Sequence, residues 1–301
     1  MYTVCVLYSS SSVIREAVHQ KLTAKKRRCK LGVALAASYT LTEPSLLLKT
    51  IKIGVLGRLL AVFRVDNVVF FIDRADAWKE ASLAKRILEY MVTAPYLRRY
   101  VYPPNVPDLR YAGVLPPLQL PTHGVGGPRE GEIREALVLR PVRQGVVVEA
   151  GLSKPVLART NKKYRRGQRV LIRIESLSPI SVTLLQKTDI YSGFSVHIEE
   201  SLTRLLRKYR DKYYVIATSR KGNTIDIENL RARSHSVCNK GVLVVFGSPS
   251  EGLFELAEHE GQRLTSLVDE VVNTVPGQGT LTVRVEEAVA ATLAILNLFL
   301  D

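Results

Sequence analysis

Residues 241–253 read GVLVVFGSPSEGL, an apolar run that ends in a loop of Gly, Ser and Pro. The run is typical of a strand buried on both faces, which carries no alternation of polar residues. Two further segments repeat the arrangement. Residues 213–217 lead into TSRKG (218–222), and the strand expected over 269–275 overlaps the start of the loop 273–279. Ligands bind outside the carboxyl ends of the strands in open α/β sheets. The sequence therefore predicts one ligand site where the three loops meet.

The composition of the three loops indicates the kind of ligand. They are rich in Gly, Pro, Ser and Thr and poor in carboxylates, so they present backbone N–H and C=O groups to a small polar molecule. Neither G-x-x-x-x-G-K-[ST] nor G-x-G-x-x-G occurs, which disfavours a nucleotide hydrolase. A single loop of this kind could be an ordinary turn. Three such loops at strand ends favour a binding site.

Cysteine usage and hydropathy predict a cytoplasmic protein without membrane contact. Cys5, Cys29 and Cys238 show no CxxC or CxxH spacing, which argues against a disulfide framework and against a metal site. No apolar run reaches the roughly 18 residues that suggest a membrane span. Residues 1–12 lack the basic start of a signal peptide, and we interpret them as containing the first strand.

Strands and helices alternate at both ends of the chain, which predicts a mostly parallel sheet. In the first hundred residues we expect strands over 2–8 and 62–72, and helices over 13–22, after Pro44 and over 76–100. In the last third we expect helices over 199–212, 253–260 and 284–300, besides the three strands above.

The middle of the chain follows a different pattern. Residues 102–131 contain seven prolines, which exclude a regular helix and mark a boundary. Short β-rich runs follow, separated by turn residues, at 136–139, 145–150, 155–158, 169–174 and 180–184. This pattern predicts a small antiparallel barrel of the OB type. We therefore divide the chain into the first half of an α/β domain (1–104), an inserted barrel (105–186) and the second half (187–301).

The charge balance points to a polyanionic partner. The chain carries 43 Lys and Arg against 28 Asp and Glu, a net charge of +15, which favours nucleic acid although basic surfaces also occur without it. The segment NKKYRRGQR (161–169) is predicted to be a hairpin that stacks a base on its tyrosine and holds a phosphate, or else a charged tip with a structural tyrosine. The candidate nucleic-acid contacts are Lys25, Lys26, Arg27, Arg28, Lys162, Lys163, Tyr164, Arg165, Arg166, Arg220 and Lys221. Further basic clusters lie at 98–99 and 204–212.

Two segments in the last third resemble one known family. VVFGSPSEGL (244–253), followed by NTVPGQGTLTVRVEEAV (273–289), is similar to the cofactor loops of the SPOUT superfamily of RNA methyltransferases. The closer resemblance is to its archaeal and eukaryotic subfamily with a central OB-fold insertion. The resemblance extends over essentially the whole chain through the segments 50–73, 111–123, 191–196 and 215–222.

This resemblance implies an architecture and a cofactor. It implies a C-terminal trefoil knot, an exception to the rule that chains do not thread loops. It also implies a homodimer with active sites near the subunit interface, and S-adenosyl-L-methionine as the cofactor. The residues that would bind it are Thr218, Ser219, Phe246, Gly247, Ser248, Pro249, Gly252, Asn273, Thr274, Val275, Pro276, Gln278, Gly279, Leu281 and Thr282.

The resemblance also suggests how the reaction is assisted. Arg58, placed after a strand and five residues before Phe63, is similar to the arginine motif of SPOUT enzymes. A guanidinium would stabilise the anion that an RNA nucleophile becomes when it loses its proton. Arg58 could instead be a phosphate contact or an ion-pair partner, and Arg284 is the second candidate for the catalytic role.

The resemblance alone favours RNA over DNA. We expect a single-stranded or looped ribosomal RNA as substrate and a uridine ring nitrogen as acceptor. Pro249 stands where ribose-methylating relatives often carry a glutamate, which argues against ribose methylation. The alternative is a non-catalytic RNA-binding or ribosome-assembly protein that keeps the knot as a scaffold. These hypotheses differ at the three loops, since only the enzyme needs the cofactor.

Overall fold

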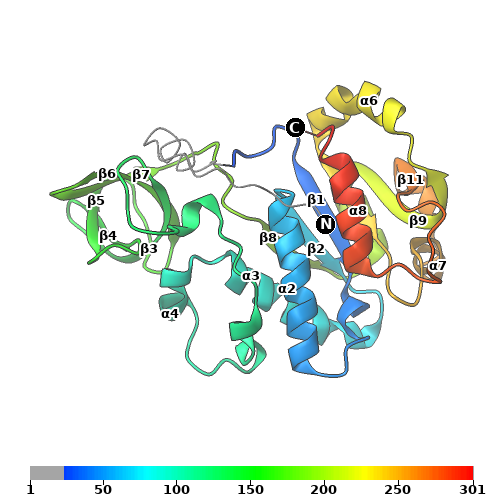
Figure 1. Ribbon diagram of the computed structural model, residues 1–301, viewed down its shortest axis with the longest axis horizontal. Coiled ribbons are helices and arrows are strands. Elements are labelled where there is room, and N and C mark those ends of the chain that lie inside the picture. The colour runs from blue at the N-terminus through cyan, green and yellow to red at the C-terminus, as the bar shows by residue number, and fades with distance from the viewer. Residues whose placement is uncertain (1–23, 301) are drawn as a thin grey trace, which may run out of the picture.

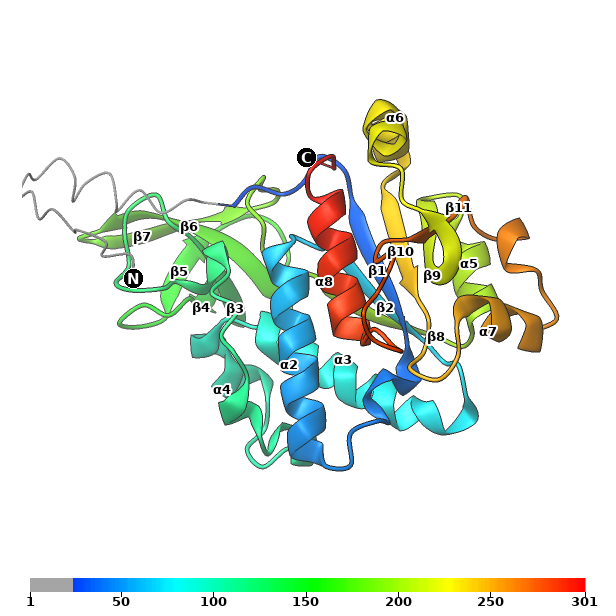
Figure 2. The ribbon, with the colours of Figure 1, turned by 45° about the vertical axis from the view of Figure 1, so that its right-hand side comes forward.

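The computed structural model describes residues 24–300 (Figure 1). The strand predicted over 2–8, the helix predicted over 13–22 and Cys5 lie outside the described residues. The described chain forms two sheets, a six-stranded parallel sheet and a five-stranded antiparallel sheet. Figures 1 and 2 show the antiparallel sheet beside the larger α/β body.

The larger sheet has the strand order β11-β9-β10-β1-β2-β8, and every neighbouring pair is parallel, as predicted. Its strands are β1 (Leu31–Ala36), β2 (Asn67–Phe71), β8 (Ser195–Glu199), β9 (Tyr214–Thr224), β10 (Val242–Phe246) and β11 (Glu270–Asn273). The sequence analysis missed β1 and β8. All six residues of β1 are buried, and the strand lies between β10 and β2, which belong to opposite ends of the chain.

Helices cover both faces of this sheet. α2 (Leu46–Val62), α3 (Trp78–Val92), α6 (Ile227–Lys240) and α8 (Val285–Leu296) contribute to one hydrophobic core. α5 (Leu202–Tyr209) and α7 (Leu253–His259) contribute to the other. Burial on both faces explains why the strands are continuously apolar.

Several predicted boundaries were wrong, and α6 was not predicted. The strand predicted over 62–72 begins only at Asn67, because α2 continues to Val62 and Arg64 then turns with a φ of 51°. The helix predicted over 76–100 ends at Val92. Pro95 starts a 3-10 turn there before the short α4 (Arg98–Val101), since proline cannot continue the preceding helix.

The antiparallel sheet contains all five strands predicted for the barrel. They are β3 (Ile133–Val142), β4 (Gly145–Glu149), β5 (Val156–Arg159), β6 (Arg169–Leu177) and β7 (Ile180–Leu185), in the order β5-β4-β3-β6-β7. The two edge strands β5 and β7 lie close together, so the sheet is nearly closed around its own core. The prediction of a hairpin over 161–169 was wrong. This basic segment crosses from β5 to β6, which are separated in the sheet by β4 and β3.

A buried carboxylate joins the barrel-like sheet to the α/β body. Glu135 of β3 accepts a hydrogen bond from the backbone N–H of Ala94 (2.9 Å), and its own carbonyl accepts one from the Tyr96 hydroxyl (2.6 Å). Its side chain also pairs with Arg169 of β6.

The proline-rich stretch between α4 and β3 contains 3-10 turns and no regular helix, as its prolines predicted.

Cys29 and Cys238 form a disulfide bond, so the expectation of no disulfide was wrong. Their separation of 209 residues gives no hint of the pairing. Cys29 precedes β1 and Cys238 lies near the end of α6, which leads into β10. Because β1 and β10 are neighbours, the two Cα atoms come within 4.6 Å.

Within residues 24–300, no helix is long and apolar enough to span a membrane, and no group of metal-ligating side chains is present.

Arg27 connects the start of the described chain to its end. The side chain is buried and donates from Nε to the Phe63 carbonyl (3.0 Å) and from Nη1 to the Leu300 carbonyl (3.2 Å). Nη2 donates to the side chain of Asn297. A guanidinium committed to these acceptors does not face solvent, so Arg27 was wrongly assigned to the nucleic-acid contacts.

We expect Arg27→Ala to lower the free energy of unfolding by roughly 2–3 kcal/mol, because several hydrogen bonds to a buried charge are lost together. Denaturant unfolding followed by circular dichroism measures this change. Arg28→Ala is the matched control, since Arg28 is exposed and its replacement should leave stability unchanged. Equal stability of the two variants would contradict this role of Arg27.

Candidate active site

The three predicted segments meet at one cavity of about 400 Å³, beside residues 218–221 of β9 and outside the carboxyl ends of β10 and β11. Of the residues assigned to the cofactor, only Pro276 and Gly279 do not line it. Those that do are Thr218, Ser219, Phe246, Gly247, Ser248, Pro249, Gly252, Asn273, Thr274, Val275, Gln278, Leu281 and Thr282.

The first of these segments differs from the prediction. Residues 218–222 are not a loop after β9 but part of it, because β9 extends to Thr224. The pairing with β11 shifts there, since Val271 lies opposite Ala217 and Val272 lies opposite Asn223. The intervening residues bulge out of the ladder, which brings Thr218 and Ser219 to the cavity.

The loop after β10 is a tight turn. The Ser248 N–H donates to the Glu251 carbonyl (2.9 Å), and the Glu251 N–H donates to the Ser248 hydroxyl (2.9 Å). A Cβ on Gly247 would lie 3.0 Å from the Glu251 carbonyl oxygen and 3.2 Å from the Gly252 Cα. Only glycine therefore fits at position 247 without moving the backbone of the turn.

Asn273 and Gln278 order the third wall of the cavity. The Asn273 side chain accepts a hydrogen bond from the Val275 N–H (3.0 Å) and donates to the Arg220 carbonyl (3.3 Å). Gln278 donates to the carbonyls of Thr280 (2.8 Å) and Leu281 (3.0 Å). Leu281 itself is 85% exposed at the cavity. This wall therefore offers an ordered backbone and an exposed apolar side chain.

Charged residues that sequence analysis assigned elsewhere or missed also line the cavity. Arg220 and Lys221, assigned to nucleic acid, lie in its wall, where Lys221 pairs with Glu255 and lowers the pKa of that carboxyl. The lining residues that were not predicted are Ser250, Glu251, Glu255, Val283, Val285 and Ala288. These residues lie inside the quoted segments 244–253 and 273–289 or, for Glu255, in the first turn of α7, and this position in the sequence could have identified them as lining residues.

Neither catalytic candidate lines this cavity. The prediction that Arg58 follows a strand was wrong: it lies inside α2, and its Nη1 donates to the carbonyls of Pro117 (3.1 Å) and Leu118 (2.8 Å). Phe63 is the C-cap residue of α2. Arg284 is the exposed N-cap residue of α8, and both of its neighbours, Val283 and Val285, line the cavity.

The remaining basic candidates lie on the surface. Lys25, Lys26 and Arg28 are exposed. The cations of the crossing segment, Lys162, Lys163, Arg165 and Arg166, are exposed as well. Tyr164 is half-buried, and its hydroxyl accepts a hydrogen bond from Gln186 of the barrel (2.6 Å).

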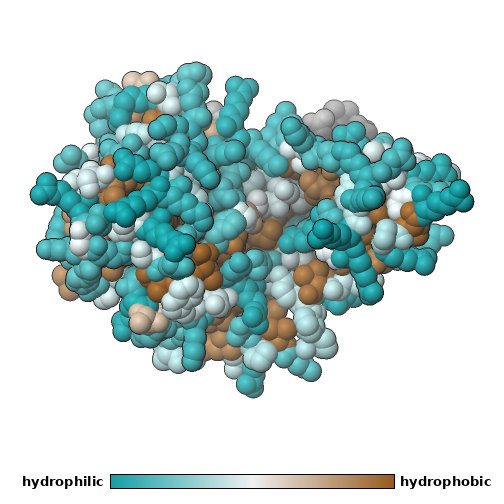
Figure 3. Space-filling view, turned by 180° about the vertical axis from the view of Figure 1, so that it is seen from behind, coloured by the Kyte–Doolittle hydropathy of each residue, from teal (hydrophilic) through white to brown (hydrophobic). Residues whose placement is uncertain are grey.

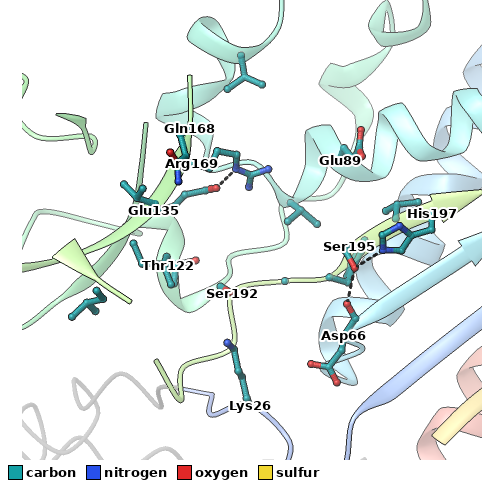
Figure 4. A pocket seen from close by; sticks show the side chains of 18 of the residues that line it. Lys26, Asp66, Glu89, Thr122, Glu135, Gln168, Arg169, Ser192, Ser195 and His197 are labelled. Carbon is teal, nitrogen blue, oxygen red and sulfur yellow. Dashed lines mark hydrogen bonds and ion pairs between the residues drawn. The ribbon is translucent and has the colours of Figure 1, made fainter. Parts of the chain in front are cut away.

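A larger cleft of about 1060 Å³ separates the barrel from the α/β body. Figure 3 shows the hollow between the two parts from behind. In Figure 4, Gln168 and Arg169 lie on the barrel side, while Ser195 and His197 lie on the β8 side, where their side chains are hydrogen-bonded (3.1 Å). Because β8 and β11 are opposite edges of the sheet, this cleft and the smaller cavity lie at different ends of the molecule.

Comparison with known proteins identifies the family. The sequence profile of the family described as "Putative RNA methyltransferase" matches residues 30–296. The chain belongs to this family. The match confirms the resemblance to SPOUT RNA methyltransferases and the prediction of an enzyme, and methyl transfer requires a site for a methyl donor.

Relatives of this RNA methyltransferase occur in archaea and animals. An uncharacterized protein of Halobacterium salinarum is 33% identical over 83% of the chain and 92% of its own length. The human 28S rRNA (uridine-N(3))-methyltransferase is 30% identical over 89% of the chain and 77% of its own length. The Drosophila melanogaster enzyme of the same name is 29% identical over 89% of the chain and 61% of its own length.

Proposed function

We propose that this RNA methyltransferase transfers the methyl group of S-adenosylmethionine to a uridine ring nitrogen in ribosomal RNA. The observation that carries the proposal is the single cavity formed by the three loops. The names of the human and Drosophila relatives support ribosomal RNA as the substrate and uridine N3 as the acceptor. We further propose that the protein acts in the cytoplasm, on the ground of this ribosomal substrate, since the Cys29–Cys238 bond removes the argument from cysteine usage.

The lining of the cavity suits S-adenosylmethionine. Backbone of the loop after β10 and of residues 273–275, with the apolar side chains of Phe246 and Leu281, would hold the flat neutral adenine. The carboxylate of Glu251 lies on the same cavity and suits the positive charge of a sulfonium, whereas Glu255 is paired with Lys221. The cavity volume lies in the range of small-molecule sites.

We expect Gly247→Val to weaken S-adenosylmethionine binding at least tenfold, because its Cβ would displace the Glu251 carbonyl and the Gly252 Cα. Isothermal titration calorimetry measures the affinity. Gly127→Val is the matched control: Gly127 does not line this cavity, and its new Cβ would meet no atom within 4 Å. Unchanged affinity in Gly247→Val would place the cofactor elsewhere.

The protein residues have a limited chemical task, because the sulfonium supplies an already activated methyl group. They must align the RNA nucleophile and favour its deprotonated form. Arg58 and Arg284 are our candidates for this charge stabilisation. Since neither lines the cavity of its own chain, we propose that Arg58 acts on the cavity of a second copy.

The outer face of α2 supports such a homodimer. Leu48, Ile51, Val55 and Val62 are 42%, 42%, 43% and 54% exposed on one side of this helix. Arg58 lies seven residues after Ile51 and three after Val55, at the edge of the same face. A contiguous apolar face marks a contact surface. We propose that a second copy covers it, as the SPOUT resemblance implies, and that this contact brings Arg58 toward the partner's cofactor.

We expect Val55→Glu to convert the dimer to a monomer, because a carboxylate at this contact would be buried without a partner. Light scattering after size-exclusion chromatography measures the mass. Methylation should fall with the dimer, while S-adenosylmethionine binding stays within about twofold of the wild type.

Leu157→Glu is the control for this variant. Leu157 is 39% exposed, but on the barrel, so its replacement should leave the mass unchanged. Mixed dimers test the role of Arg58: Arg58→Ala and Gly247→Val copies, each inactive alone, should together restore one site. A wild-type monomer that methylates RNA, or mixtures without recovery, would contradict the shared site.

The path of the C-terminal segment supports the proposed knot. The chain leaves β11 at one edge of the sheet and returns to α8, which packs against α2 and β10 in the middle. We propose that residues 274–284 thread through the preceding loops on this path.

We also propose that residues 105–186 form an OB-type insertion. The residues that we propose to contact RNA are Lys162, Lys163, Tyr164, Arg165, Arg166 and the exposed Lys25, Lys26 and Arg28.

A further inference from the structure

A second, unassigned pocket lies where α3 ends and the proline-rich stretch begins. Its volume is about 600 Å³. Three arginines line it, Arg98, Arg99 and Arg110, together with Tyr90 and Tyr102. The other lining residues are neutral, so no carboxylate of residues 24–300 lines this pocket.

The arginines of this pocket lack acidic partners within the described chain. Arg98 donates from Nε to the Thr93 carbonyl (3.2 Å) and from Nη2 to the Met91 carbonyl (3.4 Å), which fixes its guanidinium at the end of α3. Arg99 donates to the Tyr100 hydroxyl (2.9 Å). By contrast, Arg86 on the same helix pairs with Asp108 (3.3 Å). Three cations held together without carboxylates favour an anionic ligand.

The two tyrosines give the pocket an aromatic wall. The rings of Tyr90 and Tyr102 meet edge to face with centroids 5.1 Å apart. The Arg98 guanidinium lies 4.3 Å from the centroid of the Tyr90 ring, so this cation covers one face of the ring. Burial raises the pKa of Tyr102, and its hydroxyl lies 3.4 Å from the Thr93 hydroxyl.

We infer that this pocket binds one nucleotide of single-stranded RNA, with the phosphate on the arginines and the base against the tyrosines. Base stacking on aromatic rings combined with phosphate contacts is how proteins hold single strands without reading their sequence. An acidic peptide would use the cations but would gain little from the aromatic wall. Tyr102 also lines the large cleft beside the barrel. A bound strand could therefore continue past Tyr102 toward Tyr164. The inference rests on the proposed function, since it presupposes an RNA substrate.

The double variant Arg99→Ser/Arg110→Ser tests the pocket, because both side chains are exposed and neither pairs with a carboxylate of the described chain. Binding of a fluorescent single-stranded oligouridylate, measured by anisotropy over a range of salt concentrations, should weaken roughly tenfold. The slope of log K against log salt should become shallower by about 0.7, the value for one phosphate contact on a single strand. Lys79→Ser/Lys240→Ser, which removes the same charge from exposed residues outside the pocket, should leave the slope unchanged.

A photocrosslink tests the aromatic wall directly. An oligonucleotide with 4-thiouridine should crosslink to a peptide that contains Tyr90 or Tyr102, and Tyr90→Leu should reduce the yield at that peptide. Equal affinity and slope in the arginine variant, or displacement of the RNA from the wild type by polyglutamate at equal charge, would overturn the inference. S-adenosylmethionine titration of the same proteins separates the two claims. If the wild type binds neither RNA nor cofactor, the proposed function is refuted. If the wild type binds both, but its RNA affinity and salt slope equal those of the arginine variant, only the pocket is refuted.

Discussion

The backbone pairing of β1 with β10 on one side and β2 on the other holds this protein together. β1 and β2 come from the first quarter of the chain and β10 from the last, so neither end completes the sheet without the other. The Cys29–Cys238 bond and the buried Arg27 side chain reinforce the same junction. The backbone N–H and C=O groups of a buried strand must be hydrogen-bonded, so each strand needs its neighbours in the sheet. The resulting strand order determines which loops lie next to each other.

The placement of the chemistry follows from this order. β9, β10 and β11 lie side by side at one edge, so residues 218–221 of β9 and the loops after β10 and β11 converge on one cavity. β8, at the other edge, leads out of the barrel and forms one wall of the large cleft. The methyl donor and the single-stranded RNA are therefore assigned to separate parts of one copy. The proposed second copy, docked on α2, would bring the two together.

The sequence predicted those features that depend on local patterns. Continuous apolar runs identified β9, β10 and β11, and short β-rich runs separated by turn residues identified every strand of the barrel-like sheet. β1 was missed because LGVALA contains small residues and follows a basic cluster. The role of Arg27, the disulfide and the crossing of residues 161–169 depend on contacts distant in sequence, which no local pattern encodes. The pocket at Arg98 was seen only as two adjacent basic residues, because Tyr90 and Arg110 join them through the turn after α3.

The central claim is that the cavity at β9, β10 and β11 serves methyl transfer to a base of ribosomal RNA. Its most direct test is incubation of the purified protein with unmodified ribosomal RNA and S-adenosylmethionine that carries a deuterated methyl group. The RNA is then digested to nucleosides for mass spectrometry. The account predicts deuterated methyl on the base of uridine, at N3. Label on the ribose, or no label although the protein binds both cofactor and RNA, would contradict it.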